Sequence, residues 1–173
     1  ANFSLKLCEE LQVTCKLEFV SVERNSGDGL EAAARRARHM AFAKAEEDWL
    51  MLAHQRDDQA ETLLFNLLRG TGLAGAAAMQ ERNGRLLRPF LAVGRDEIQR
   101  YALHHGLEWC EDESNADIGL TRNFLRKRIF PNLCERFPAA SANFAKAAAR
   151  FGEANDLLDD LARNDLPTYI GNF

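Results

Sequence analysis

The sequence predicts an α/β fold, in which part of a doubly wound parallel sheet is followed by an all-helical segment. Trp49–Ala53 is an apolar run without alternation, as expected of a parallel strand that is covered on both faces. A helical pattern follows it at once, and extended and helical stretches alternate up to about residue 117. The later pattern is helical only. We therefore expect an α/β part over residues 1–117 and a helical subdomain over residues 118–173.

Three elements are predicted before this strand. Leu5–Leu11 has the amphipathic pattern of a helix, and the partly alternating apolar side chains within Val13–Val22 predict a strand. Asn25–Gly29 has the composition of a loop, and the alanine-rich stretch from Leu30 to about Glu47 predicts a second helix.

The helix after the strand is predicted to begin near Asp57 and to end at Gly70, a residue type that often follows a helix. Asp57 or Asp58 can cap its first turn, and Glu61 completes a capping-box-like pair with Asp58. Its buried stripe consists of leucines at helical spacing, namely Leu63, Leu64, Leu67 and Leu68.

Shorter elements follow this helix. An extended segment is predicted within Arg85–Leu91, a helix over Gly94–His105 and another short strand at Leu107–Cys110. The acidic stretch Glu111–Asp117 is expected to be a loop, and helices continue from Thr121 onward.

The composition is that of a soluble globular protein, with 46% hydrophobic and 28% charged residues among 173. The net charge of −4 gives no overall basic field, so any contact with RNA has to come from a local patch. The four cysteines are scattered without a C-x-x-C pair, which argues against a disulfide scaffold, a zinc ribbon or an iron–sulfur site. No apolar run approaches membrane-spanning length, and reduced thiols point to the cytoplasm.

A histidine and three carboxylates follow the carboxyl end of the predicted strand, where open α/β sheets bind ligands: His54, Asp57, Asp58 and Glu61. Because the carboxylates fall within one helical turn, two or three of them can converge on a cation or an amine. Acidic side chains in a first turn also stabilise a helix through its dipole, so capping alone is the alternative. His54 can accept a proton or contact phosphate, or it can be structural.

Three segments of the chain each contain a distinctive sequence motif. His54–Gly75 contains H-x-x-D-D-Q-x-E-T followed by L-L-R-G-x-G-L-x-G, Leu30–His39 reads L-E-A-A-A-R-R-A-R-H, and Trp109–Arg126 contains E-D-E-S-N-A-D and R-N-F-L-R. Together they resemble the tRNA(Ile)-lysidine synthase family of the PP-loop ATP pyrophosphatase superfamily, although His39 replaces a tyrosine of the family's pattern. The resemblance implies a Rossmann-like fold of the adenine nucleotide alpha hydrolase type, with residues 1–117 as the C-terminal portion of the PP-loop domain.

The resemblance also implies a ligase reaction on bacterial tRNA(Ile). ATP would adenylate the C2 carbonyl oxygen of the anticodon's first cytidine, and the ε-amine of free lysine would then displace AMP. ATP, Mg²⁺, free lysine and tRNA(Ile) are therefore the expected substrates and partners, while the assembly state, a homodimer included, stays open. No membrane partner is expected.

The family's S-G-G-x-D-S loop, whose backbone N–H groups hold ATP phosphates, does not occur in this sequence. The family's further C-terminal domains also have no counterpart in it, and residues 118–173 would then link to them. We therefore expect the 173-residue chain alone to be catalytically inert.

The resemblance implies a role for each group of candidate residues. Asp57, Asp58 and Glu61 would hold the lysine ammonium and supply a proton acceptor, with His54 as a further catalytic candidate and with Asp58 and Glu61 as candidate Mg²⁺ ligands. Lysine, ATP or tRNA would be bound by a set of polar residues: Arg35, Arg38, Arg69, Asp112, Asn115, Arg122 and Arg126. Arg122 and Arg126 lie one helical turn apart, and each either braces the acidic loop or contacts a phosphate.

Two other functions compete with this one. A cytidine thiolase of the same superfamily would carry C-x-x-C pairs for sulfur chemistry, which the sequence lacks. A non-catalytic binding module would use the same carboxylates only as helix caps, and it would have no affinity for lysine.

Overall fold

The computed structural model describes residues 1–22, 30–111 and 117–165, and the side chains of the second range from residue 32 onward. The chain divides into two compact units. The first comprises residues 1–48 with 109–111, and the second comprises residues 49–108 with 112–173. The described residues contain no helix that is both long and apolar enough to cross a membrane.

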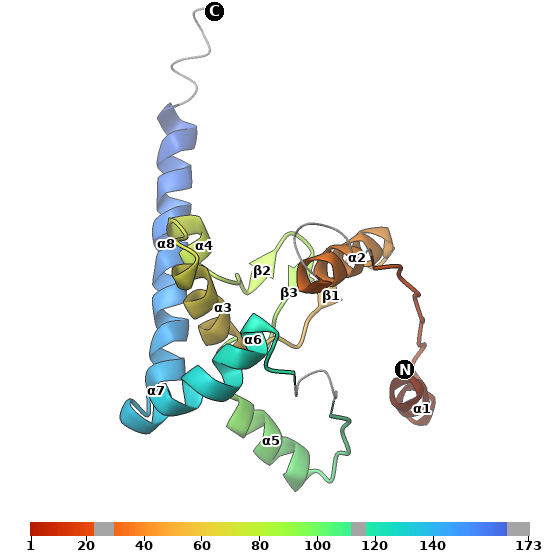
Figure 1. Ribbon diagram of the computed structural model, residues 1–173. Helices are drawn as coiled ribbons and strands as arrows, with labels where there is room; N and C mark the ends of the chain where they lie inside the picture. The colour runs from red at the N-terminus through yellow and green to blue at the C-terminus, as the bar shows by residue number, and fades with distance from the viewer. Residues whose placement is uncertain (23–29, 112–116, 166–173) are drawn as a thin grey trace, which may run out of the picture. The chain divides into compact units, whose positions relative to one another are not determined.

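The described residues of the first unit form two helices (Figure 1), and both were predicted. α1 spans Asn2–Glu10 and α2 spans Leu30–Lys44. Ala33 and Ala37, one turn apart, are buried residues of α2.

The strand predicted within Val13–Val22 is wrong for the structure described. This segment forms no strand, and Phe19 within it is 88% exposed. Alternating side chains do not suffice for a strand, because its backbone N–H and C=O groups need a neighbouring strand. For the same reason no strand forms at Leu107–Cys110, where a second one was predicted.

The second unit contains a small mixed sheet in the order β1-β3-β2, with strands Leu50–Met51 (β1), Arg82–Asn83 (β2) and Leu86–Leu87 (β3). β1 runs parallel to β3, as the apolar run predicted, and β2 pairs antiparallel with β3 across a turn at Gly84. The prediction that both faces of the first strand are covered is wrong. β1 is an edge strand among the described residues, and Met51 is 71% exposed.

α3 spans Arg56–Leu68 and begins with a capping pair that was not the one predicted. Gln55 is the residue before the helix, and its side-chain oxygen accepts the N–H of Asp57 at 2.7 Å. The Asp58 carboxylate in turn accepts the N–H of Gln55 at 3.0 Å. The pairing of Asp58 with Glu61 as a cap is therefore wrong, since Asp58 reaches backward to Gln55. Gly70 has a φ of +73°, which confirms its predicted place just after the helix.

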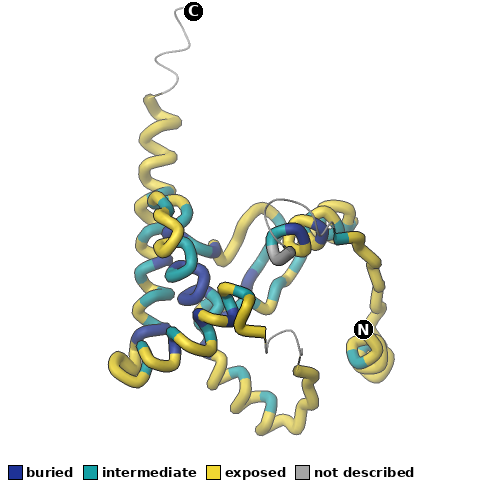
Figure 2. Tube along the Cα trace, in the orientation of Figure 1, coloured by how far each residue is buried: buried dark blue, intermediate teal, exposed yellow. Residues whose placement is uncertain are grey.

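The core of the second unit lies between α3, the short helix α4 (Leu73–Ala76) and the long helix α8 (Ala140–Asp165). It is centred on Leu63, Ala76 and Ala148, and the buried stretches of α3 and α8 face one another in Figure 2. Of the four leucines predicted to be buried, only Leu63 is fully so. Leu64 is half-buried, while Leu67 and Leu68 are exposed near the end of α3.

α5 spans Arg95–His104, close to the helix predicted there. After residue 117 the structure is helical, as predicted: α6 (Thr121–Phe124), the π-helical η2 (Leu125–Ile129) and α7 (Phe130–Arg136) precede α8. The predicted domain boundary near residue 117 stays a prediction.

The wide turn of η2 lies just before Pro131, which occupies the first turn of α7. Proline has no N–H to donate to the preceding turn, and the N–H of Phe130 donates instead to the carbonyl of Leu125, five residues earlier. Arg126 lies within this π-helical turn, so the direction of its side chain differs from the one it would have in an uninterrupted α-helix.

Candidate active site

Arg126 joins two of the predicted carboxylates into one cluster. Its Nε donates to Glu61 Oε1 at 2.7 Å, and its Nη2 donates to Glu61 Oε2 at 2.8 Å and to Asp58 Oδ1 at 2.9 Å. The Glu61 contact has the two-pronged geometry in which guanidinium binds carboxylate most strongly. The structure therefore connects the first turns of α3 to η2 through two ion pairs, across 65 and 68 residues of sequence.

The third carboxylate, Asp57, is held by two other helices. Its Oδ1 accepts the Ser141 hydroxyl of α8 at 2.5 Å, and its Oδ2 accepts the backbone N–H of Arg95 in α5 at 2.9 Å. Asp57 thus connects the start of α3 to α5 and α8, and its predicted part in holding lysine stays a prediction.

Gln59 of the same motif also has a structural role. Its side-chain amide donates to the carbonyl of Met79 at 2.7 Å and accepts the N–H of Met79 at 2.9 Å, and all of these atoms are buried. A side-chain amide that pairs with a peptide group in this way replaces a backbone partner that Met79 would otherwise lack. The motif residue Gln59 therefore anchors the segment that follows α4.

Burial raises the pKa of the Glu61 carboxyl above its ordinary value, and the neighbouring Asp58 carboxylate adds to this, although Arg126 opposes both effects. The side chain of Glu61 is only 6% exposed, so its charged form loses most of its hydration. The guanidinium of Arg126 is hydrogen-bonded to both carboxylates, and the charge of Arg122 also lowers the pKa of Glu61, by less than burial raises it. A carboxylate with a raised pKa is a better proton acceptor than an exposed one.

The raised pKa of Glu61 predicts how stability depends on pH. Because the folded protein holds this proton more tightly than the unfolded chain, the stabilisation is present below the ordinary pKa of 4.5 and is lost as the pH rises through the folded pKa. We expect the free energy of unfolding of the unaltered protein, minus that of Glu61→Gln, to fall in urea titrations as the pH is raised above 4.5. A difference that rises over this range would mean that pairing with Arg126 outweighs burial.

Arg69 and Arg122 lie over the same aromatic ring. The guanidinium carbon of Arg69, at the end of α3, is 5.2 Å from the centroid of Phe65, and that of Arg122 in α6 is 5.6 Å from it. Both distances are in the range of cation–π contacts. Two of the arginines predicted to bind lysine, ATP or tRNA are thus gathered near the carboxylate helix, as the neighbours of Phe65.

Among the described residues the hydrogen bonds of the Arg126 side chain go to Asp58 and Glu61, a pairing that neither alternative included, and bracing of the acidic loop by Arg126 stays a prediction. For Arg122 neither alternative is decided. Asp112 and Asn115 lie outside the described residues. His54 is half-buried in the segment between β1 and α3.

The two other arginines that were predicted to bind substrate, Arg35 and Arg38, belong to the first unit. They are exposed on α2, and the structure describes them separately from the carboxylate cluster. Their predicted part in substrate binding stays a prediction.

Asp58 and Glu61 do not fit the predicted Mg²⁺ site as they stand here. Mg²⁺ needs carboxylate oxygens that face it in octahedral geometry. Both oxygens of Glu61 accept hydrogen bonds from Arg126, while those of Asp58 are divided between Arg126 and the N–H of Gln55. The described residues contain no group of three acidic, histidine or cysteine side chains arranged for a metal.

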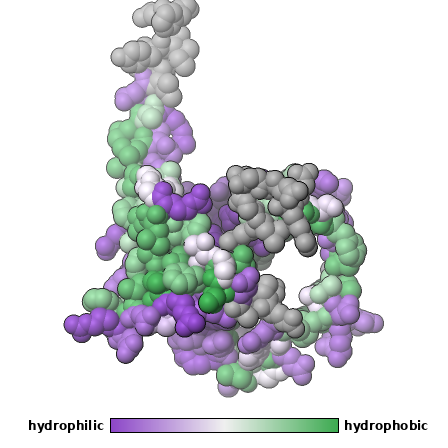
Figure 3. Space-filling view, in the orientation of Figure 1, coloured by the Kyte–Doolittle hydropathy of each residue, from purple (hydrophilic) through white to green (hydrophobic). Residues whose placement is uncertain are grey.

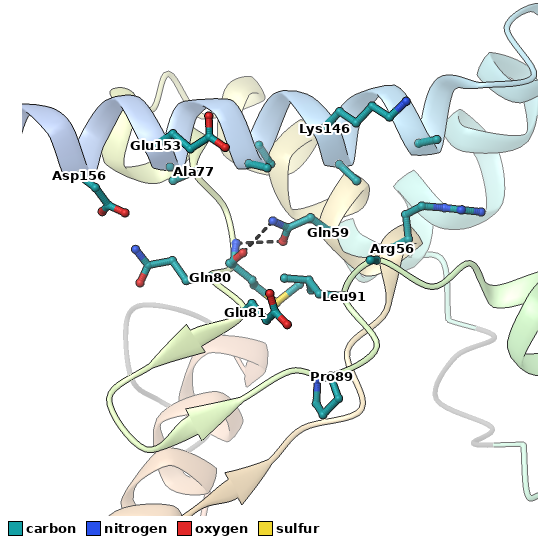
Figure 4. Close-up of a pocket in the computed structure, with 17 residues that line it drawn as sticks. Arg56, Gln59, Ala77, Gln80, Glu81, Pro89, Leu91, Lys146, Glu153 and Asp156 are labelled. Carbon is teal, nitrogen blue, oxygen red and sulfur yellow. Dashed lines mark hydrogen bonds between the residues drawn. The ribbon is translucent and has the colours of Figure 1, made fainter.

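A cavity of about 770 Å³ lies beside this site, between the segment after α4 and one face of α8 (Figure 4). Its apolar lining includes Met79, Leu91 and Ala149, and the Gln59 amide closes one side through its two bonds to Met79. None of the described residues that the sequence nominated for catalysis or substrate binding lines it. The cavity is thus separate from the carboxylate cluster.

Two partners in the site were missed by sequence reasoning. Ser141, 84 residues from Asp57, carries no local signal of its contact. Phe65 is not among the candidate residues, although its spacing of four residues from Arg69 on a helix allows the two side chains to meet.

The carboxylate cluster combines residues from two of the three sequence motifs. Both motifs lie within the part of the chain that one family model matches. The model of the PP-loop domain matches residues 1–133. The chain belongs to the PP-loop family. The predicted α/β fold class is thereby confirmed for this PP-loop chain.

Curated relatives of this PP-loop chain carry the name tRNA(Ile)-lysidine synthase. The protein of Azoarcus sp. (strain BH72) is 46% identical over 171 residues, which are 95% of this chain and 38% of the relative. The protein of Pseudomonas putida (strain KT2440) is 48% identical over 166 residues, or 92% of this chain and 38% of the relative. The chain thus spans less than half the length of these relatives. The predicted resemblance to this family is confirmed.

A solved structure shares the fold. The U34-tRNA thiolase NcsA from Methanococcus maripaludis, solved with its [4Fe-4S] cluster, superimposes with a TM-score of 0.63 at 18% identity. The match covers 88% of this chain and 55% of the thiolase.

Proposed function

We propose that this chain is part of a tRNA(Ile)-lysidine synthase, an ATP-dependent carbon–nitrogen ligase. The C2 carbonyl oxygen of the wobble cytidine attacks the α-phosphate of ATP and pyrophosphate leaves. The ε-amine of free lysine then attacks C2, and AMP departs with the oxygen. The observation that carries the proposal is an identity of 46–48% to curated lysidine synthases over more than nine tenths of the chain.

The carboxylate cluster supplies the chemistry that the second step requires. Lysine has to be held as an ammonium and then deprotonated before its nitrogen can attack. Asp58 and Glu61 already hold one cation, the guanidinium of Arg126, between them. In the proposal the lysine ammonium takes up part of this position, and Glu61, whose pKa is raised by burial, accepts the proton.

The arginines near Phe65 are proposed to bind phosphate. Arg69 and Arg122 would offer guanidinium donors to phosphates of the tRNA or of ATP, next to the carboxylates. This local grouping fits a chain of net charge −4, which has no overall attraction for RNA. Arg35, Arg38, Asp112 and Asn115 are proposed as further contacts on the family's pattern, with His54 as an additional proton acceptor or phosphate contact.

Mg²⁺ belongs to the proposed reaction as the counter-ion of the ATP phosphates, and no step here runs through a metal at Asp58 or Glu61. Their oxygens are taken by Arg126 and Gln55. We also propose that the protein is located in the cytoplasm and that it can form a homodimer.

The proposal is tested by lysine-dependent release of AMP from ATP in the presence of tRNA(Ile). We expect release by the whole gene product that contains this chain. The 173-residue chain alone is expected to be inactive, because its sequence has no S-G-G-x-D-S loop to hold the phosphates. Activity of the chain alone would refute the second expectation. A whole gene product that consumes ATP without needing lysine would refute the first.

A tRNA thiolase is the second candidate, because the solved thiolase shares the fold. Thiolation would leave AMP release independent of lysine and would require a sulfur donor. The four cysteines of this chain form no C-x-x-C pair, which disfavours this candidate. A binding module would bind neither lysine nor ATP productively and would release no AMP.

A further inference from the structure

The carboxylate of Asp57 lies where three helices begin. Asp57 is the second residue of α3, Arg95 is the first residue of α5, and Ser141 is the second residue of α8. The Arg95 N–H and the Ser141 hydroxyl both donate to this carboxylate, at 2.9 and 2.5 Å. The start of a helix carries the positive end of the helix dipole, which attracts a carboxylate. Asp57 is therefore the point at which the three helices meet.

The two donors hold the carboxylate in one orientation. Ser141 binds Oδ1 and the Arg95 N–H binds Oδ2, so both oxygens of Asp57 are fixed. A carboxylate oxygen can accept about two hydrogen bonds, and each oxygen of Asp57 therefore keeps acceptor capacity for a further donor. An ammonium group, which has several N–H donors and no acceptor, is suited to such oxygens.

Asp57 also acts on the cation of the carboxylate cluster. The hydrogen bond with Glu61 raises the pKa of Arg126 above its ordinary value, although burial lowers it. The charges of Glu61, Asp58 and Asp57 raise it further. The charge of Asp57 thus reaches the place where the proposed function puts the lysine ammonium.

The contact between Asp57 and Ser141 lies away from the apolar core of the second unit. α3, α5 and α8 begin in the lower half of the view in Figure 1, where Figure 3 shows many hydrophilic residues. The core around Leu63 lies further along α3 and α8. Ser141→Ala would therefore leave the core packing unchanged, and alanine suits a helix.

We propose that Ser141 is a positioning residue for the binding of lysine. Its hydroxyl holds the Asp57 carboxylate in the orientation in which this carboxylate accepts a hydrogen bond from the ε-ammonium of lysine. The inference rests on the proposed function and adds to it a residue that lies outside all three sequence motifs. The other contact of Asp57 comes from a backbone N–H, so Ser141 is the partner whose side chain a substitution can remove.

The test is Ser141→Ala in the whole gene product that contains this chain, with lysine-dependent release of AMP in the presence of tRNA(Ile) as the readout. We expect the KM for lysine to rise about tenfold, the scale of losing one hydrogen bond to a charged group. The kcat and the KM for ATP should stay within about twofold, because the substitution leaves Asp58, Glu61 and the phosphate-binding groups in place. A loss of fold would instead change all three values.

Two further variants separate positioning from a general effect on α8. Asn155→Ala removes a hydrogen bond to Asp159 on the surface of the same helix, and it should leave the KM for lysine unchanged. Asp57→Asn should itself raise this KM, and adding Ser141→Ala to it should raise the KM by less than about twofold more, since the positioned carboxylate is already gone.

Three results would overturn this inference alone: an unchanged KM for lysine in Ser141→Ala, an equal rise in the KM for ATP, or a full tenfold effect of Ser141→Ala in the Asp57→Asn protein. Absence of lysine-dependent AMP release from the unaltered whole gene product would refute the proposed function, and this inference with it.

Discussion

Glu61→Gln is expected to lower lysidine formation by the whole gene product about a hundredfold or more, the scale of losing a positioned proton acceptor. Glutamine keeps the size of the side chain and one oxygen that can accept from Arg126, but it can neither take a proton from lysine nor balance its charge. The loss should appear mainly in kcat, with a further rise in the KM for lysine. Lysidine in tRNA(Ile), measured by mass spectrometry after timed incubation, gives the readout.

The control for this substitution is Glu97→Gln. Glu97 also lies beside an arginine, at 3.4 Å from Arg56, and it accepts the N–H of Gly94 at 2.8 Å, yet it is on α5 outside the carboxylate cluster. Glu97→Gln should weaken these contacts while activity stays within about twofold. Normal turnover of a folded Glu61→Gln protein would leave the carboxylates with positioning roles only.

The helix that carries the carboxylates could be predicted because its signals are local. Gly70 after the last turn and the acidic residues in the first turn act within a few residues of chain, and the structure has α3 over Arg56–Leu68. The same holds for α5, which begins after Gly94 and ends before Gly106 with its φ of +61°.

The contacts that assemble the site could not be predicted, because they join distant parts of the chain. Arg126 was assigned to a loop or a phosphate, since these were its nearest candidates in sequence, while its partner Glu61 lies 65 residues away. Whether Arg126 pairs with Glu61 depends on the burial of that glutamate, and no local sequence pattern predicts the burial of a single glutamate. The strand predictions at Val13–Val22 and Leu107–Cys110 failed for a related reason, because pairing along a strand depends on a neighbour rather than on its own residues.

The cap of α3 is an intermediate case. A carboxylate three residues into the helix was recognised as part of a capping pair, but Glu61 was paired with Asp58 instead of Asp58 with Gln55. The observed cap residue, Gln55, lies one helical turn before the predicted cap residue, Asp58. The sequence favoured Asp58 because glutamine is a less usual residue before a helix than aspartate. This shift matters for function, since it leaves Glu61 available for Arg126.

Arg126→Met is expected to lower the free energy of unfolding by about 3 kcal/mol, the lower end for breaking a buried ion pair. Methionine fills similar space, but Asp58 and Glu61 would then face each other without a cation, and Glu61 is 6% exposed. Urea unfolding of the 173-residue chain near neutral pH measures the loss, which should shrink in acid as the carboxylates take up protons. Arg128→Met, an exposed arginine on the same η2, is the control and should change stability by less than about 0.5 kcal/mol. Combining Arg126→Met with Glu61→Gln should recover part of the loss, because one of the two facing charges is gone. Equal effects of the Arg126 and Arg128 substitutions would mean that water screens the cluster as it does an ordinary surface pair.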